Sequence, residues 1–140
     1  MFKLVKVPNK NTGVPEMITI KSPYGGHVKA GGVYFLADDS LTTFRPEKEV
    51  VLFYVTETLK SGNSRNTVRG FIITPGMIFL ADVDSPFTDR RIGHAFTINS
   101  GGNDPMSAVL PSENGDGFSY GILLSIYQTE KTGKVYVMFN

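Results

Sequence analysis

The sequence contains no cysteine and no tryptophan, and it has two histidines among its 140 residues. The lack of cysteine excludes disulfides, thiolate nucleophiles and cysteine-bound metals. No apolar run reaches the roughly 18 residues that a membrane helix needs, and the first residues, MFKLVKVPNK, lack the apolar stretch of a signal peptide. We therefore expect a protein without a membrane partner that folds in a cytoplasm.

Charge is also scarce. Lysine and arginine total 14, aspartate and glutamate total 13, and charged residues make up 19% of the chain. A net charge of +1 gives no long-range attraction for nucleic acid or anionic lipid, so no nucleic-acid partner is expected. A surface with few charges relies on neutral polar groups or is covered by a partner. The length and the hydrophobic fraction of 41% predict one folded domain over residues 1–140.

Apolar residues mostly recur with a period of two, or form short β-branched and aromatic runs, and turn residues separate the segments. This pattern predicts an all-β fold, an antiparallel β-sandwich or barrel of jelly-roll-like type with little helix. The expected strands are Phe2–Val7, Met17–Lys21, His27–Ala30, Val33–Ala37, Glu49–Thr56, Thr67–Thr74, Met77–Ala81, Ala95–Ile98, Ser107–Leu110, Gly121–Gln128 and Lys134–Phe139.

One segment also has features of a helix. Pro46 and the charged residues of Glu47–Lys60 suit a helix start, but Val50–Thr56 is strongly β-prone, so we expect a central strand there. A short helical turn near Arg45–Lys48 remains open. Within the fold, Phe35, Phe79, Leu52 and Tyr54 are expected to be mostly buried.

Two stretches, GGVYFLADDS at residues 31–40 and PGMIFLADVDS at residues 75–85, are similar. The favoured interpretation is a repeated turn-strand-turn unit in related positions of the sheets, with the aspartate ending the strand. Coincidence is one alternative. The other is a cation site formed by Asp38/Asp39 and Asp82/Asp84, whose carboxylates suit a hard ion such as Ca²⁺.

No set of residues predicts catalysis. His27 and His94 have no Gly-x-Ser-x-Gly nucleophile motif to serve and no histidine or cysteine close by in the sequence for a zinc site. The paired glycines do not lead into a helix carrying lysine and serine or threonine, so a phosphate-binding loop is not predicted. We expect no catalytic, cofactor-binding or metal-binding residues and no cofactor.

The chain resembles small auxiliary virion proteins of tailed bacteriophages, the capsid decoration or cement class. The resemblance comes from Val28–Leu36, from the second turn-strand unit at Thr74–Asp84, and from a cysteine-free, strand-dense chain that starts at Met1. It implies a β-sandwich or barrel that docks on the major capsid protein or other virion subunits, often as a symmetric homo-oligomer. It also implies a location in the virion, assembled in the host cytoplasm, and no catalytic residues.

The residues expected to bind a partner are Phe2 and Leu4 on the first strand, and Arg65, Arg90 and Arg91 on polar loops. Two other functions stay open. A carbohydrate- or peptide-binding β-sandwich would present an aromatic patch drawn from Tyr24, Tyr54 and Tyr120. A small hydrolase would use His94 or His27 with Asp82 or Asp84.

Overall fold

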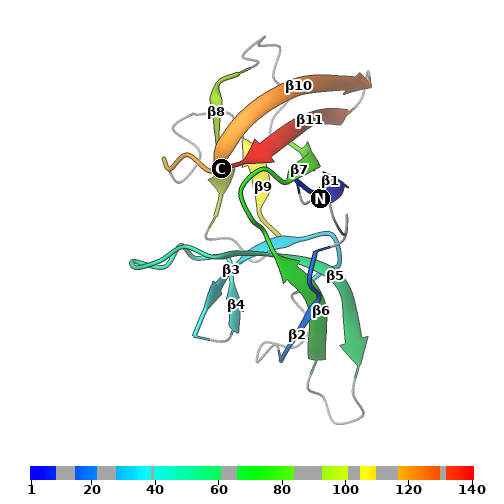
Figure 1. The fold of residues 1–140 in the computed structure, drawn as a ribbon, viewed down its shortest axis with the longest axis vertical. Coiled ribbons are helices and arrows are strands. Elements are labelled where there is room, and N and C mark those ends of the chain that lie inside the picture. The colour runs from blue at the N-terminus through cyan, green and yellow to red at the C-terminus, as the bar shows by residue number, and fades with distance from the viewer. Residues whose placement is uncertain are drawn as a thin grey trace. The chain divides into compact units, whose positions relative to one another are not determined.

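The computed structural model describes residues 1–8, 15–21, 28–38, 40–60, 66–83, 93–100, 105–109, 117–129 and 132–140. Eleven strands and no helix lie within these ranges. The chain divides into two compact units, one of Met1–Val14, Thr74–Ser100 and Ser107–Asn140, the other of Pro15–Ile73 and Gly101–Met106. Each unit contains one sheet (Figure 1). The single domain expected over residues 1–140 stays a prediction.

The first unit contains a six-stranded sheet, in which the neighbouring strands are antiparallel. Its strands, in spatial order, are β1 (Phe2–Lys6), β7 (Ile78–Asp82), β11 (Thr132–Phe139), β10 (Gly121–Thr129), β8 (Ala95–Asn99) and β9 (Ser107–Val109). The β10–β11 hairpin is long and curved (Figure 1). One isolated parallel bridge between Val83 and Ala108 brings β9 back to the end of β7. The described strands therefore curl without closing into a continuous barrel.

Aromatic rings fill the inner face of this sheet. Burial alternates along β7, which places Phe79 inward at 0% exposure. Phe139, the last residue of β11, contacts three other rings, with centroid distances of 6.1 Å to Phe2, 5.4 Å to Phe79 and 5.2 Å to Phe96. The pairs with Phe79 and Phe96 are edge-to-face, a geometry that adds to the gain from apolar burial. Four strands of the sheet, β1, β7, β8 and β11, thus share one core.

The second unit contains a five-stranded antiparallel sheet. Its strands, in spatial order, are β2 (Ile18–Lys21), β6 (Asn66–Ile72), β5 (Leu52–Lys60), β3 (Val33–Ala37) and β4 (Ser40–Thr42). Its core is a cluster of five buried side chains, namely Tyr34, Leu41, Phe53, Val55 and Val68. Partly buried aliphatic residues of β2, including Ile18 and Ile20, pack against it.

The predicted all-β fold class is confirmed: the described residues form two antiparallel sheets and no helix. All but one of the expected strands are present, with ends displaced by a few residues. The Glu47–Lys60 stretch forms strand β5 from Leu52, between β6 and β3, so the expectation of a central strand is correct. No helical turn forms at Arg45–Lys48. Of the residues expected in the core, Phe35 and Phe79 are 0% exposed and Leu52 is 8% exposed, whereas Tyr54 is partly exposed.

One expected strand is wrong and one strand is additional. The described part of His27–Ala30 is not a strand, because its backbone is held by a turn. The amide of Gly32 donates to the carbonyl of Lys29 at 3.1 Å, and Gly31 adopts a φ of 82° that favours glycine. Strand β4 was not expected, since three residues are too few to show a period of two.

The two similar stretches occupy comparable places. Strands β3 and β7 each lie second from one end of their sheet, and the matched Phe35 and Phe79 are both fully buried. Each strand follows a turn that contains a glycine of positive φ, Gly31 in one case and Gly76 in the other. The interpretation as repeated structure is consistent with these positions.

Candidate functional site

The outer face of the six-stranded sheet, opposite the aromatic core, carries adjoining apolar side chains. Strands β7 and β11 are apolar on both faces: Ile78, Leu80, Tyr136 and Met138 alternate with the buried inner residues and stay partly exposed. The strand register places Ile78 opposite Met138, Met138 opposite Ile122, and Ile122 opposite Ala95. An antiparallel sheet that meets water on one face usually carries polar residues there. On this outer face, the positions named above are instead apolar and partly exposed.

Side chains of the first strand, β1, alternate between the core and this outer face. Phe2 is 2% exposed, and its ring packs against those of Phe79 and Phe139. Leu4 is partly buried and lies opposite Phe79 in the register. The Phe2 side chain therefore belongs to the interior of the unit, and the partner-binding role expected for Phe2 and Leu4 stays a prediction.

Strand β1 is an edge strand with features that discourage pairing. The register shifts between Leu4 and Lys6, which marks a bulge at Val5, and the Val5 side chain is 52% exposed. Lys3 and Lys6 are also exposed. Bulges and lysines are devices by which natural edge strands avoid adding another strand. Recognition through the side chains of the neighbouring face fits this edge better than addition of a partner's strand.

Arg65, Arg90 and Arg91 lie outside the described residues, and so do Asp39, Asp84, His27 and Tyr24. The partner-binding role predicted for the three arginines stays a prediction. The structure therefore places Phe2 and Leu4 on one strand and leaves the loop component of the predicted site undescribed.

The two aspartates of the candidate cation site have different surroundings. Asp38 occupies the turn between β3 and β4, where its φ of 48° is one that aspartate tolerates better than most residues. Asp82 ends β7, where its carboxylate contacts the amino group of Met1 and lies 3.9 Å from the Nζ of Lys134. The two residues belong to different compact units. Among the described residues, no three histidine or acidic side chains form a group that could hold a metal ion.

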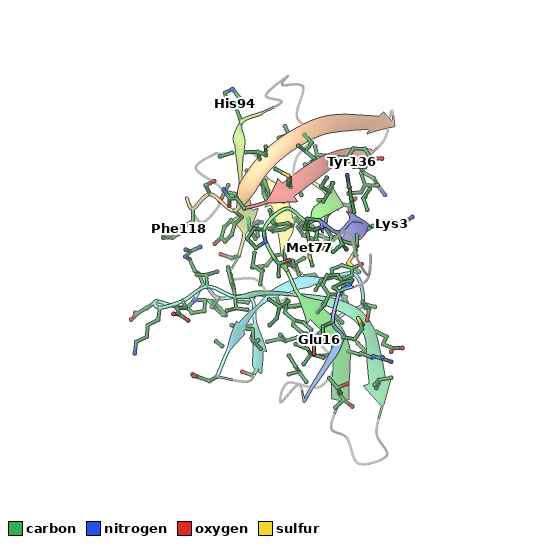
Figure 2. The ribbon with its side chains drawn as sticks, viewed as in Figure 1. Lys3, Glu16, Met77, His94, Phe118 and Tyr136 are labelled. Atoms are coloured by element: carbon green, nitrogen blue, oxygen red, sulfur yellow. The ribbon has the colours of Figure 1, made fainter. Side chains whose placement is uncertain are left out.

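His94 precedes β8 and is exposed to solvent. Its backbone carbonyl accepts a hydrogen bond from the amide of Leu123 at 2.9 Å. Figure 2 shows its side chain at the beginning of β8. Asp82, the described carboxylate considered for the hydrolase alternative, is already engaged by two amino groups. The hydrolase alternative gains no support from these positions.

The two described tyrosines considered for a glycan-binding patch belong to different compact units. Tyr120 is 6% exposed in the first unit, whereas Tyr54 lies in the second unit, with its ring 5.1 Å from that of Phe71. Partial burial of Tyr54 raises the pKa of its hydroxyl above the ordinary value. These two tyrosines do not supply the exposed aromatic pair that a glycan platform requires.

Some large apolar side chains are exposed individually. Phe44 after β4 is 65% exposed, Phe118 before β10 is 49% exposed, and Leu59 on β5 is 38% exposed. Single exposed apolar residues are common on protein surfaces and carry little functional information. The outer face of the six-stranded sheet is different because its apolar residues adjoin one another across four strands.

Sequence reasoning did not select this outer face. The signal was present in IFLAD and VYVMF, where apolar residues occupy both parities of the strand.

No helix among the described residues could cross a membrane. The chain matches no family model, no curated protein and no solved structure.

Proposed function

We propose that the protein is a non-enzymatic structural subunit of a viral particle, which binds the major capsid protein or other virion subunits as a decoration or cement protein. The observation that carries this proposal is the apolar outer face of the six-stranded sheet, formed by Ile78, Leu80, Tyr136 and Met138 with Ile122. Exposure of such an apolar surface to water is unfavourable, and a protein partner that covers it stabilises the complex through apolar burial.

The low charge of the chain supports the same function. With a net charge of +1, binding cannot depend on a strong overall field, so shape and apolar contact must provide most of the affinity. A decoration subunit tolerates modest affinity at each contact, because copies that are linked on one particle gain from effective concentration. The resemblance in sequence to virion decoration proteins supplies the class of assembly.

Co-sedimentation with candidate capsids that lack this protein tests the proposal. The wild-type protein should pellet with the capsids to a saturating ratio. Met138→Glu, which places a charge in the centre of the outer face, should bind much less. Leu59→Glu is the matched control, since Leu59 is an exposed apolar strand residue of the other unit, and this variant should bind like the wild type.

His94→Ala separates the structural function from the enzymatic alternative. Because His94 is exposed and lies outside the apolar face, the variant should bind capsids as the wild type does. If the wild-type protein binds no capsid but binds a glycan or peptide at micromolar concentration, the proposed function is wrong and the binding-module alternative replaces it.

A further inference from the structure

The apolar outer face has a positive edge. In the β1–β7 register, Lys3 lies opposite Leu80 and Lys6 lies opposite Ile78. Leu80 and Ile78 in turn lie opposite Tyr136 and Met138 of β11. The two lysines therefore border the apolar residues along strand β1, and Figure 2 shows the Lys3 side chain extending away from the strand.

The charge of this edge is not cancelled within the described residues. Among the described residues, the acidic residue on the same face is Asp82, and its carboxylate is already shared between Lys134 and the amino group of Met1. Lys3 and Lys6 form no ion pair with any described residue. The strand register continues from Lys6 through Ile78, Met138 and Ile122 to Ala95 on β8. Ala95 carries no charge. The outer face thus has an apolar centre, a cationic side at β1 and an uncharged side at β8.

We propose that this face binds a different protein whose contact surface has an apolar centre and carboxylates along one side, placed against Lys3 and Lys6. The proposal rests on the proposed function, since it specifies the virion surface to which the subunit attaches. Complementary charges at the rim of an interface speed up association and fix orientation, whereas the desolvated centre determines how long the complex lasts. The lysines therefore set how the subunit is oriented, and Ile78, Tyr136 and Met138 retain it.

A second copy of the chain is a poor occupant for the same face. Face-to-face association of two copies brings together lysines and apolar residues, but the carboxylate of Asp82 is already held by two amino groups. The described residues of this face supply no second carboxylate to place opposite Lys3 and Lys6, so the proposal assigns that carboxylate to a different protein. Self-association through this face is the competing outcome of the test below.

The test measures association and dissociation rates on immobilised capsids that lack the protein. Lys3→Glu/Lys6→Glu should slow association about tenfold or more and leave dissociation nearly unchanged, as is typical of charges at the rim of an interface. The matched control, Lys29→Glu/Lys48→Glu, makes the same change in net charge with exposed lysines of the other unit and should bind like the wild type. Met138→Glu should instead raise the dissociation rate. Added salt should slow association of the wild type more than that of Lys3→Glu/Lys6→Glu.

The outcomes separate the two proposals. Failure of the wild type to bind any capsid contradicts the proposed function. If the wild type binds, equal association rates for the two double variants would show that the lysine edge does not recognise the partner, and the inference would be wrong while the function stands. Concentration-dependent dimers of the free protein that disappear in Met138→Glu would overturn the inference in favour of a second copy.

Discussion

Phe79 and Phe139 meet edge to face, with their ring centroids 5.4 Å apart, in the core of the six-stranded sheet. They lie on the adjacent strands β7 and β11, and both are buried, at 0% and 2% exposure. The pair joins two segments that are distant in the sequence, and the ring of Phe2 closes the group from β1. The stability of the first unit should depend on these rings more than on any surface contact.

Phe79→Ala should lower the free energy of unfolding by about 3–5 kcal/mol, because it removes a fully buried ring and leaves a cavity among neighbouring rings. Urea unfolding followed by circular dichroism measures the change. Phe118→Ala is the control, since Phe118 is 49% exposed, and it should alter stability by less than about 0.5 kcal/mol. Equal losses for the two variants would contradict the aromatic core.

Gly121→Ala should destabilise the protein by about 1–3 kcal/mol through overpacking. A Cβ at this position would lie 1.9 Å from the carbonyl oxygen of Met138, so the paired backbones of β10 and β11 would have to move apart. Gly133→Ala is the comparison, because its nearest obstacle is a methyl group of Val83 at 2.4 Å, which can shift. Thermal unfolding of both variants should show the larger loss at Gly121, and the reverse order would be inconsistent with the β10–β11 pairing.

Tyr54 should make the fold sensitive to alkaline pH. Burial raises its pKa in the folded state above the unfolded value of 10.0, so the folded protein holds the proton more tightly. The resulting stabilisation is fully present below pH 10 and is lost as the pH rises through the folded pKa. Urea unfolding between pH 8 and about pH 11 should show a steeper alkaline loss for the wild type than for Tyr54→Phe. An equal loss of stability with rising pH in the wild type and in Tyr54→Phe would contradict this role of Tyr54.

Substitutions of the adjacent residues Phe2 and Lys3 should differ in their effect on the free energy of unfolding. Phe2→Ala removes a ring that is 2% exposed and should lower stability, which makes deletion of β1 unsuitable as a test of attachment. Lys3→Ala changes an exposed side chain and should leave the urea midpoint almost unchanged. A large loss of stability at Lys3 would mean that the two faces of β1 have been assigned the wrong way round.

The sequence predicted the strands because most of them carry a clear period of two or a dense β-branched run between turn residues. Strand β5 could be identified through the strongly β-prone Val50–Thr56, despite the neighbouring charges that suit a helix. A strand was expected at His27–Ala30, because the hydrogen bond from the amide of Gly32 to the carbonyl of Lys29, which holds the described part in a turn, has no signature in composition.

The candidate site was harder to predict than the fold. In β7 the residues of both parities are apolar, so the sequence predicts a buried Phe79 but does not decide whether the opposite face is buried or exposed. That choice depends on the register with β1 and β11, which is set by contacts between distant segments. For the same reason the core position of the Phe2 ring was not expected, and its role in partner binding stays a prediction. Lys3 and Lys6 border the apolar face only because the register places them opposite Leu80 and Ile78.

Oxidation of Met138 by dilute peroxide, followed by mass spectrometry in the free and the capsid-bound protein, tests the central claim most directly. Met138 and Met17 are both partly exposed and lie in different units, while Met77 and Met106 are each 2% exposed and give the buried baseline. We predict that binding to the capsid slows oxidation of Met138 toward the rate of that baseline and leaves Met17 unchanged. Oxidation of Met138 at the same rate in the free and bound protein would contradict the claim that this outer face is the contact surface.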